Sequence, residues 1–214
     1  MAVRCLFIDS AVPNPQNLLA TLEEGTSVHW LDPKTDGLHQ IATTLAGFQQ
    51  LETILIFAHG APGAIQLGKL SLTEATLGRY AEELAAIGES LTPDGGVQFY
   101  ACDLGQGQKG EAFVTALEEA IGAPCAAAST LVGHSDLGGN WSLDVGTLSA
   151  PTFANPQWQG LLGLTVPATE APTLDAAEES GEMPMPSRRC GPMAPSSHGD
   201  IQTVAATAAG WPAS

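Results

Sequence analysis

The chain has 214 residues, of which 44% are hydrophobic, enough to build one good-sized domain around a real core. Its formal net charge is −16, and because such a surface repels phosphate backbones, the sequence argues against nucleic-acid binding. No run approaches the roughly 18 apolar residues of a membrane span, and the apolar run at residues 3–8 is too short for a signal peptide. The four cysteines have neither CxxC nor zinc-site spacing, so we expect no metal centre and no disulfide framework.

The predicted elements alternate between strands and helices along the chain. Short apolar runs predict strands at 3–8, 26–31, 51–58, 96–102 and 125–129. Apolar residues at helical spacing predict helices at 17–22, 36–45 and 73–91, and a fourth that ends before Gly122. A small hairpin is expected at 64–72, and a last strand or hairpin at 141–145. This alternation predicts an α/β fold, a three-layer α-β-α sandwich with a mainly parallel sheet.

The composition of the chain changes after residue 166. Residues 167–214 are rich in Ala, Pro, Ser, Thr and Glu and show no periodicity that would bury an apolar face. We therefore predict a domain at 1–166 and an Ala/Pro-rich, disordered tail at 167–214.

Two of the predicted strands end in residues that can do chemistry. The run 53–58 is followed by His59 and the run 96–101 by Cys102, and the helix between them provides the crossover that two parallel strands need. If these strands are neighbours, their carboxyl ends lie about 4.8 Å apart. Open α/β sheets place their sites at this edge, so the sequence predicts a His59–Cys102 dyad.

The chemistry of such a dyad assigns a role to each group. Cys102 would attack as the thiolate, and His59 would take the thiol proton and later protonate a leaving amine. The backbone N–H groups of Gly60 and Cys102, at adjacent strand ends, could hold the oxyanion. The same spacing is equally consistent with Cys102 as a buried thiol at a strand end and His59 as a loop cap.

The order of these motifs resembles known families. An apolar block ending in His59-Gly60, followed by one ending in Ala101-Cys102, resembles the caspase, legumain, gingipain and clostripain group of cysteine peptidases. More closely, the span from about residue 6 to 145 resembles the uncharacterised DUF4347 domain. The matching pieces are residues 8–10, 31–33, 36–38, 59–63, 65–68, 100–103, 127–129 and 137–141.

The resemblance implies a caspase-like three-layer fold with His59 as base and Cys102 as nucleophile. DUF4347 domains stand at the amino end of very large bacterial surface or secreted proteins with cadherin-like and calcium-binding repeats. That context implies export, with a secretion signal at the carboxyl end, although no repeat array follows here. No cofactor is expected. The family context leaves calcium open as an alternative, although no motif in the chain indicates it.

The acidic residues at the strand ends suggest a substrate preference. In the caspase-like group, groups near the carboxyl ends of the first strands hold the residue next to the scissile bond. Here Asp9 and Asp103 end two strands and no Arg stands beside them, so we predict that they bind a Lys or Arg side chain. Asp32 and Asp36 also follow a strand, but we expect them to cap turns or helices.

Two functions of different classes follow from the sequence. The first is a cysteine endopeptidase that cuts after Lys or Arg in a peptide, a protein or its own chain, with Arg188-Arg189 as one candidate site. The second is a non-catalytic amino-terminal module of a secreted or surface adhesin-type protein. The sequence predicts no particular oligomeric state.

Overall fold

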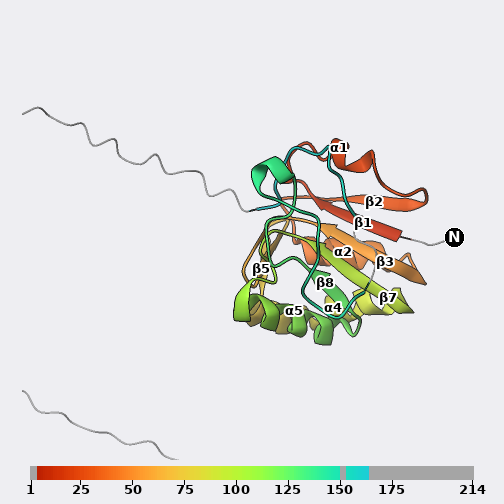
Figure 1. The fold of residues 1–214 in the computed structure, drawn as a ribbon. Helices are drawn as coiled ribbons and strands as arrows, with labels where there is room; N and C mark the ends of the chain where they lie inside the picture. The colour runs from red at the N-terminus through yellow and green to blue at the C-terminus, as the bar shows by residue number, and fades with distance from the viewer. Residues whose placement is uncertain (1–3, 150–152, 164–214) are drawn as a thin grey trace, which may run out of the picture. The chain divides into compact units, whose positions relative to one another are not determined.

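The computed structural model describes residues 4–149 and 153–163. Its middle layer is a five-stranded sheet in the order β2-β1-β3-β7-β8, in which every neighbouring pair is parallel (Figure 1). The strands are β1 (Arg4–Asp9), β2 (Thr26–Leu31), β3 (Leu51–Phe57), β7 (Leu91–Tyr100) and β8 (Cys125–Ala127). The strands that carry the predicted dyad, β3 and β7, are therefore neighbours, as the sequence predicts.

The two faces of the sheet are covered differently. Alternate side chains of β3 enter separate apolar clusters: Ile54 and Ile56 on one face, Leu55 and Phe57 on the other. The first face is covered by α2 (Gly37–Leu45), α4 (Ala81–Glu89) and α5 (Gly107–Ile121), of which α4 and α5 lie side by side (Figure 1). The second face is covered by α1 (Gln16–Leu19) and by largely irregular chain within residues 128–149 and 153–162, and η2 (Ser135–Leu137) lies in the first of these two stretches. The predicted three-layer α/β sandwich is confirmed.

A second, three-stranded antiparallel sheet follows β3. It consists of β4 (Gly60–Ala61), β5 (Ala64–Leu67) and β6 (Leu70–Thr73), so the hairpin predicted at 64–72 is confirmed. Asp9, at the end of β1, ties this sheet to the main one because its Oδ2 accepts the Gly68 N–H at 2.6 Å.

Helix boundaries agree with the capping signals of the sequence. The Asp36 carboxylate accepts the N–H groups of Leu38 and His39 at 3.1 and 3.2 Å, which begins α2. Thr73 begins α3 (Glu74–Leu77) with a reciprocal capping box. At the end of α5, Gly122 adopts the left-handed conformation with φ 74°, the usual glycine stop of a helix.

Two of the helices are shorter than the sequence predicts. The helix expected at 73–91 is divided into α3, the 3-10 turn η1 (Gly78–Tyr80) and α4, and Leu91 already belongs to β7. Within η1 the Tyr80 hydroxyl donates to Asp36 Oδ2 at 2.7 Å, and this bond to the start of α2 favours the tighter turn over a continuous helix. The helix expected at 17–22 is only the single turn α1.

The prediction of a last strand or hairpin at 141–145 is wrong. Only Val145 pairs with the sheet, through one isolated bridge to Ala127. Trp141 instead packs its ring against Phe57 and Phe153, so the segment begins on a face of the sheet and reaches the edge strand β8 only at Val145.

Among the described residues, no helix combines the length and apolar character that a membrane span requires. The predicted domain boundary at 166 and the tail at 167–214 lie outside the described residues.

Candidate active site

His59 and Cys102 occupy matching positions on neighbouring strands. Phe57 of β3 pairs with Tyr100 of β7, and each chain continues for two residues to the predicted dyad. The Ala58 N–H still donates to the Tyr100 carbonyl at 3.2 Å, so the pairing extends beyond the strands themselves. Because side chains alternate along a strand, His59 and Cys102 follow on the same face as Phe57 and Tyr100.

The His59 ring is held in one tautomer by the loop after β1. Its Nε2 lies 3.0 Å from the Ala11 carbonyl oxygen, which can only accept, so we assign the ring proton to Nε2. Nδ1 then carries a bare lone pair, and it is buried without a hydrogen-bond partner in the described part of the chain. His59 is 8% exposed. A buried imidazole nitrogen with nothing to accept is chemically suited to take a proton.

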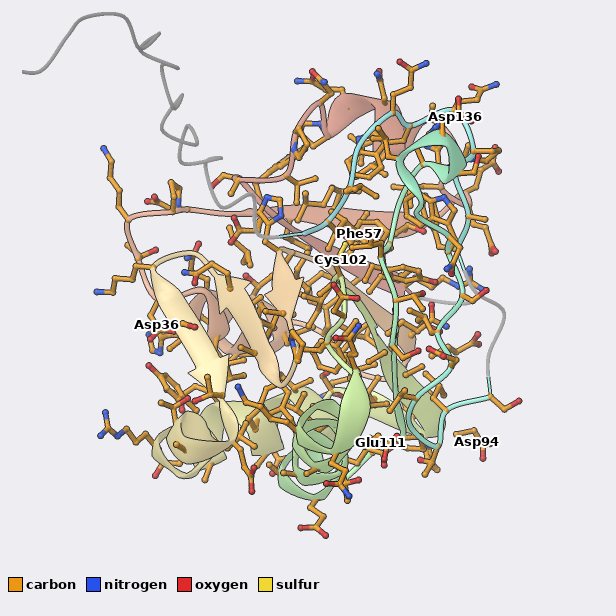
Figure 2. All side chains as sticks on the ribbon, turned by 60° about the vertical axis from the view of Figure 1, so that its left-hand side comes forward. Asp36, Phe57, Asp94, Cys102, Glu111 and Asp136 are labelled. Carbon is orange, nitrogen blue, oxygen red and sulfur yellow. The ribbon has the colours of Figure 1, made fainter. Side chains whose placement is uncertain are left out.

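Cys102 is fully buried at the end of β7, in the same apolar cluster as Phe57 (Figure 2). Its Sγ accepts the Val132 N–H at 3.1 Å and donates to the Val132 carbonyl at 3.5 Å. Burial raises the pKa of the thiol to about 11, although the backbone N–H groups of Val132 and Leu162 lower it. In this arrangement Cys102 is therefore a protonated thiol.

No hydrogen bond joins the two members of the predicted dyad among the described residues. His59 is bonded towards Ala11, which follows β1, whereas the sulfur is bonded towards Val132, which follows β8. The register of β3 and β7 ends at Phe57 and Tyr100, two residues before His59 and Cys102, and the loops after β1 and β8 bind the polar atoms of the two side chains.

The two predicted oxyanion donors bind the same carbonyl oxygen. The N–H groups of Gly60 and Cys102 donate to Leu162 O at 3.2 and 3.0 Å. Two backbone donors that converge on one carbonyl oxygen beside a thiol have the arrangement that acyl transfer requires. Gly60 has to be a glycine here, because a Cβ would lie 2.7 Å from the Cys102 carbonyl oxygen.

The carbonyl in this position belongs to residues 160–163, which we call the covering segment. Its Leu162 N–H donates to the Val132 carbonyl at 2.9 Å, and the His134 N–H donates to the Gly160 carbonyl at 2.9 Å. The Leu162 side chain is fully buried in the cluster that contains Cys102. We did not predict this segment from the sequence. The only local signal is the pattern Gly-Leu-Leu-Gly just before the composition changes.

The predicted substrate-binding acids have different surroundings. Asp9 is 1% exposed, and its carboxylate accepts the N–H groups of Ala11 and Gly68 at 2.8 and 2.6 Å. Asp103 is half-buried and adopts the left-handed conformation with φ 57° directly after Cys102. Burial raises the pKa of the Asp103 carboxyl. Its Oδ1 accepts a bond from Gln106 Nε2 at 3.2 Å.

Asp36 and Asp32 have the capping roles that the sequence predicts. Asp36 caps α2, and the exposed Asp32 closes a turn by accepting the Lys34 N–H at 2.8 Å. Within residues 4–149 and 153–163, no three His, Cys, Asp or Glu side chains are grouped so as to hold a metal ion. The candidate self-cleavage site at Arg188-Arg189 lies outside the described residues.

Comparison with known proteins gives one informative match. No curated protein matches the chain. A solved structure titled "Crystal structure of a small-chain dehydrogenase" is 14% identical, with a TM-score of 0.29, covering 56% of this chain and 68% of its own. A likeness at that level supports no inference about fold or function. The family model described as "Domain of unknown function (DUF4347)" matches residues 5–161, and the chain therefore belongs to the DUF4347 family.

Proposed function

We propose that the protein is a cysteine endopeptidase of caspase-like type, with Cys102 as nucleophile and His59 as general base. The observation that carries this proposal is the convergence of the Gly60 and Cys102 N–H groups on one carbonyl oxygen, at 3.2 and 3.0 Å. Oxyanion donors of this kind stabilise the charge that develops on a peptide carbonyl during attack.

The state of His59 supports its role as base. Because Nε2 is bonded to the Ala11 carbonyl, the free nitrogen is Nδ1, and it is buried with no partner among the described residues. The register of β3 and β7 supports a position for this ring near the thiol, because Phe57 and Tyr100 pair two residues before His59 and Cys102. Attack would require the Cys102 proton to pass to Nδ1, which would break the bond that the sulfur donates to the Val132 carbonyl. The bond that the sulfur accepts from the Val132 N–H would stabilise the thiolate.

A preference for Lys or Arg next to the scissile bond is part of the proposal. It rests mainly on Asp103, which directly follows the nucleophile and is partly exposed. Asp9 could contribute only by giving up the two backbone N–H groups that it now binds. A leucyl substrate is the natural competitor, because the side chain of Leu162 lies in an apolar cluster.

The non-catalytic module remains the second candidate function, and one observation favours it. Cys102 is 0% exposed, and its sulfur is hydrogen-bonded to the main chain of Val132 as a structural thiol would be. A domain that never cleaves peptides would have no need to expose this sulfur.

Labelling of Cys102 separates the two functions. The full chain would be treated with arginyl, lysyl, leucyl and aspartyl chloromethyl ketones, and separately with iodoacetamide, and the modified cysteine identified by peptide mapping. We expect labelling of Cys102 by the preferred ketone to fall about 100-fold in His59→Ala. The matched control is His39→Ala, at an exposed histidine on α2, which should label like the wild type.

Equal labelling rates in the wild type and His59→Ala would refute the peptidase and favour the module. The ranking of the four ketones tests the specificity, and Asp103→Asn should reduce the advantage of the arginyl and lysyl reagents. A leucyl reagent that outpaces both would refute the basic preference while leaving the peptidase intact.

A further inference from the structure

We propose that the peptide bond between Leu162 and Gly163 is a substrate of this domain's own site, and that the covering segment is bound there as a peptide substrate. This inference rests on the proposed peptidase function and names its substrate. It does not rest on the Lys/Arg preference, with which it competes, because it places a leucine immediately before the scissile bond.

The covering segment pairs with the protein in the way an extended peptide does. The Leu162 N–H donates to Val132 O, and two residues earlier Gly160 O accepts from the His134 N–H, each at 2.9 Å. Between them, Leu161 forms an antiparallel bridge with Gly133. Alternate backbone bonds of this kind are how clefts hold substrate strands without regard to most side chains.

This pairing presents one particular bond to the site. The carbonyl that receives both oxyanion donors is that of Leu162, so the bond exposed to attack is the one to Gly163. The Cys102 sulfur lies beside both residues of that bond. The Leu162 N–H is among the groups that lower the pKa of the thiol, and a Cβ on Gly163 would stand 3.6 Å from Sγ.

The side chains on either side of the bond suit this arrangement. Leu162 is fully buried in an apolar cluster, which anchors the residue before the bond. Gly163 has no side chain, and a Cβ there would stand in ordinary van der Waals contact with Cys102, 3.6 Å from Sγ and 3.7 Å from Cβ. A Leu-Gly pair therefore fits the site, because Leu162 is anchored and Gly163 places no side chain against the nucleophile.

The reaction balances with water as the only co-reactant. The Cys102 thiol gives its proton to His59 Nδ1 as sulfur bonds to the Leu162 carbonyl carbon, and the negative oxygen is held by the Gly60 and Cys102 N–H groups. The bond to Gly163 N breaks, and His59 passes the proton to the leaving amine. Water then hydrolyses the thioester to a Leu162 carboxylate and the free thiol. The products are residues 1–162 and a chain that begins at Gly163.

The test uses the full chain, purified and incubated in reducing buffer, with intact mass and amino-terminal sequencing of any new fragment. We expect a new amino terminus at Gly163, formed during expression or incubation, and none in Cys102→Ala or His59→Ala. Because the segment lies in the site of its own chain, the rate should not depend on protein concentration. A rate proportional to concentration would overturn the proposal.

A matched pair of leucines tests the choice of bond. Leu162→Ala should slow cleavage at least about tenfold, whereas Leu161→Ala, at the half-buried neighbour, should change it less than about threefold. Leu162→Met keeps the apolar volume and should still be cut, which guards against a variant that merely fails to fold.

The outcomes distinguish this inference from the function on which it rests. If Cys102 labels in a His59-dependent manner but the chain stays intact, or is cut only elsewhere, such as at Arg188-Arg189, the Leu162–Gly163 proposal fails and the peptidase stands. If neither labelling nor cleavage depends on His59, both fail.

Discussion

The substitution Gly133→Ala should expose Cys102 by displacing the covering segment. Gly133 has φ 140°, and a Cβ built on it would overlap the Gly160 carbonyl oxygen and lie 3.0 Å from the Leu161 Cα. Both are backbone atoms, so no side-chain rotation relieves the overlap. The segment must move away from the loop that holds it, while the strands that carry His59 and Cys102 are untouched.

The size of the effect follows from the bonds that the displaced segment loses. The bonds from Leu162 N to Val132 O and from His134 N to Gly160 O are both 2.9 Å long, and each contributes about 1 kcal/mol net. Relief of the overlap adds up to about 1 kcal/mol. The substitution should therefore shift the equilibrium between the covered and the open state by about 2–3 kcal/mol towards the open state. Since 1.4 kcal/mol is a factor of ten in an equilibrium, Cys102 should become accessible about 30 to 140 times more often.

Alkylation by iodoacetamide measures this opening. The experiment is done in a His59→Ala background, which removes self-cleavage, and Cys102 labelling is followed by peptide mapping. Cys5 is the internal reference because it is buried in the apolar cluster on the opposite face of the sheet. A rise in Cys102 labelling with Cys5 unchanged indicates movement of the segment, whereas a parallel rise at both indicates global unfolding.

Gly138→Ala is the matched control. Gly138 lies in the same loop at φ 80°, so an alanine there suffers the same type of backbone strain, but the nearest heavy atom to its Cβ is Leu131 Cδ1 at 4.0 Å. Cys102 should label in this variant as in the parent. If Gly133→Ala labels no faster than Gly138→Ala, the segment does not cover the thiol and the reasoning is refuted.

Three further predictions test the same structure. Because burial raises the pKa of Cys102 to about 11, its rate of alkylation should rise about tenfold for each pH unit between pH 8 and 10. A rate that levels off just above pH 8.5 would show that Cys102 titrates as an ordinary thiol and would contradict this prediction. In denaturant melts, Asp9→Ala should lower the free energy of unfolding by about 2–4 kcal/mol, because two backbone N–H groups lose their buried carboxylate partner. Asp32→Ala, at an exposed turn, should lower it by less than about 1 kcal/mol. Equal losses in the two variants would contradict the structural role of Asp9. Gly88→Ala should destabilise the domain because its Cβ would overlap a carbonyl oxygen of α5, whereas Gly78→Ala, with no atom within 4 Å, should not, and thermal melting compares the two.

The fold was predictable from the sequence because its signals are local. The strand runs, the Asp36 cap and the Gly122 stop each depend on neighbours within a few residues, and all agree with the structure. The adjacency of β3 and β7 follows from a single helical crossover between them, and it brings His59 and Cys102 to one edge.

The covering segment could not be predicted because nothing local encodes it. Leu162 lies 60 residues after Cys102 and is held by backbone hydrogen bonds. Such bonds do not depend on side-chain type, so the amino-acid sequence does not indicate them. The failed strand at 141–145 has a related cause. Its alternating apolar residues fit a strand as well as they fit irregular chain that packs on the sheet. The observed conformation depends on the tertiary contact of Trp141 with Phe57 and Phe153, which the local pattern does not contain.

The hydrogen bonding of two buried polar residues favours a reactive role for one of them. Asp9 satisfies both carboxylate oxygens with backbone N–H groups, as a residue retained for architecture does. His59 leaves Nδ1 buried and unpaired within the described chain, which costs about 1–3 kcal/mol that an apolar side chain of similar size would avoid. His59 and Cys102 each follow by two residues the paired Phe57 and Tyr100 of neighbouring strands. His29 Nε2 is also buried without a partner in the described chain, so the unpaired nitrogen alone does not identify a base. What favours that role for His59 is its position directly before Gly60, whose N–H shares one carbonyl oxygen with the Cys102 N–H.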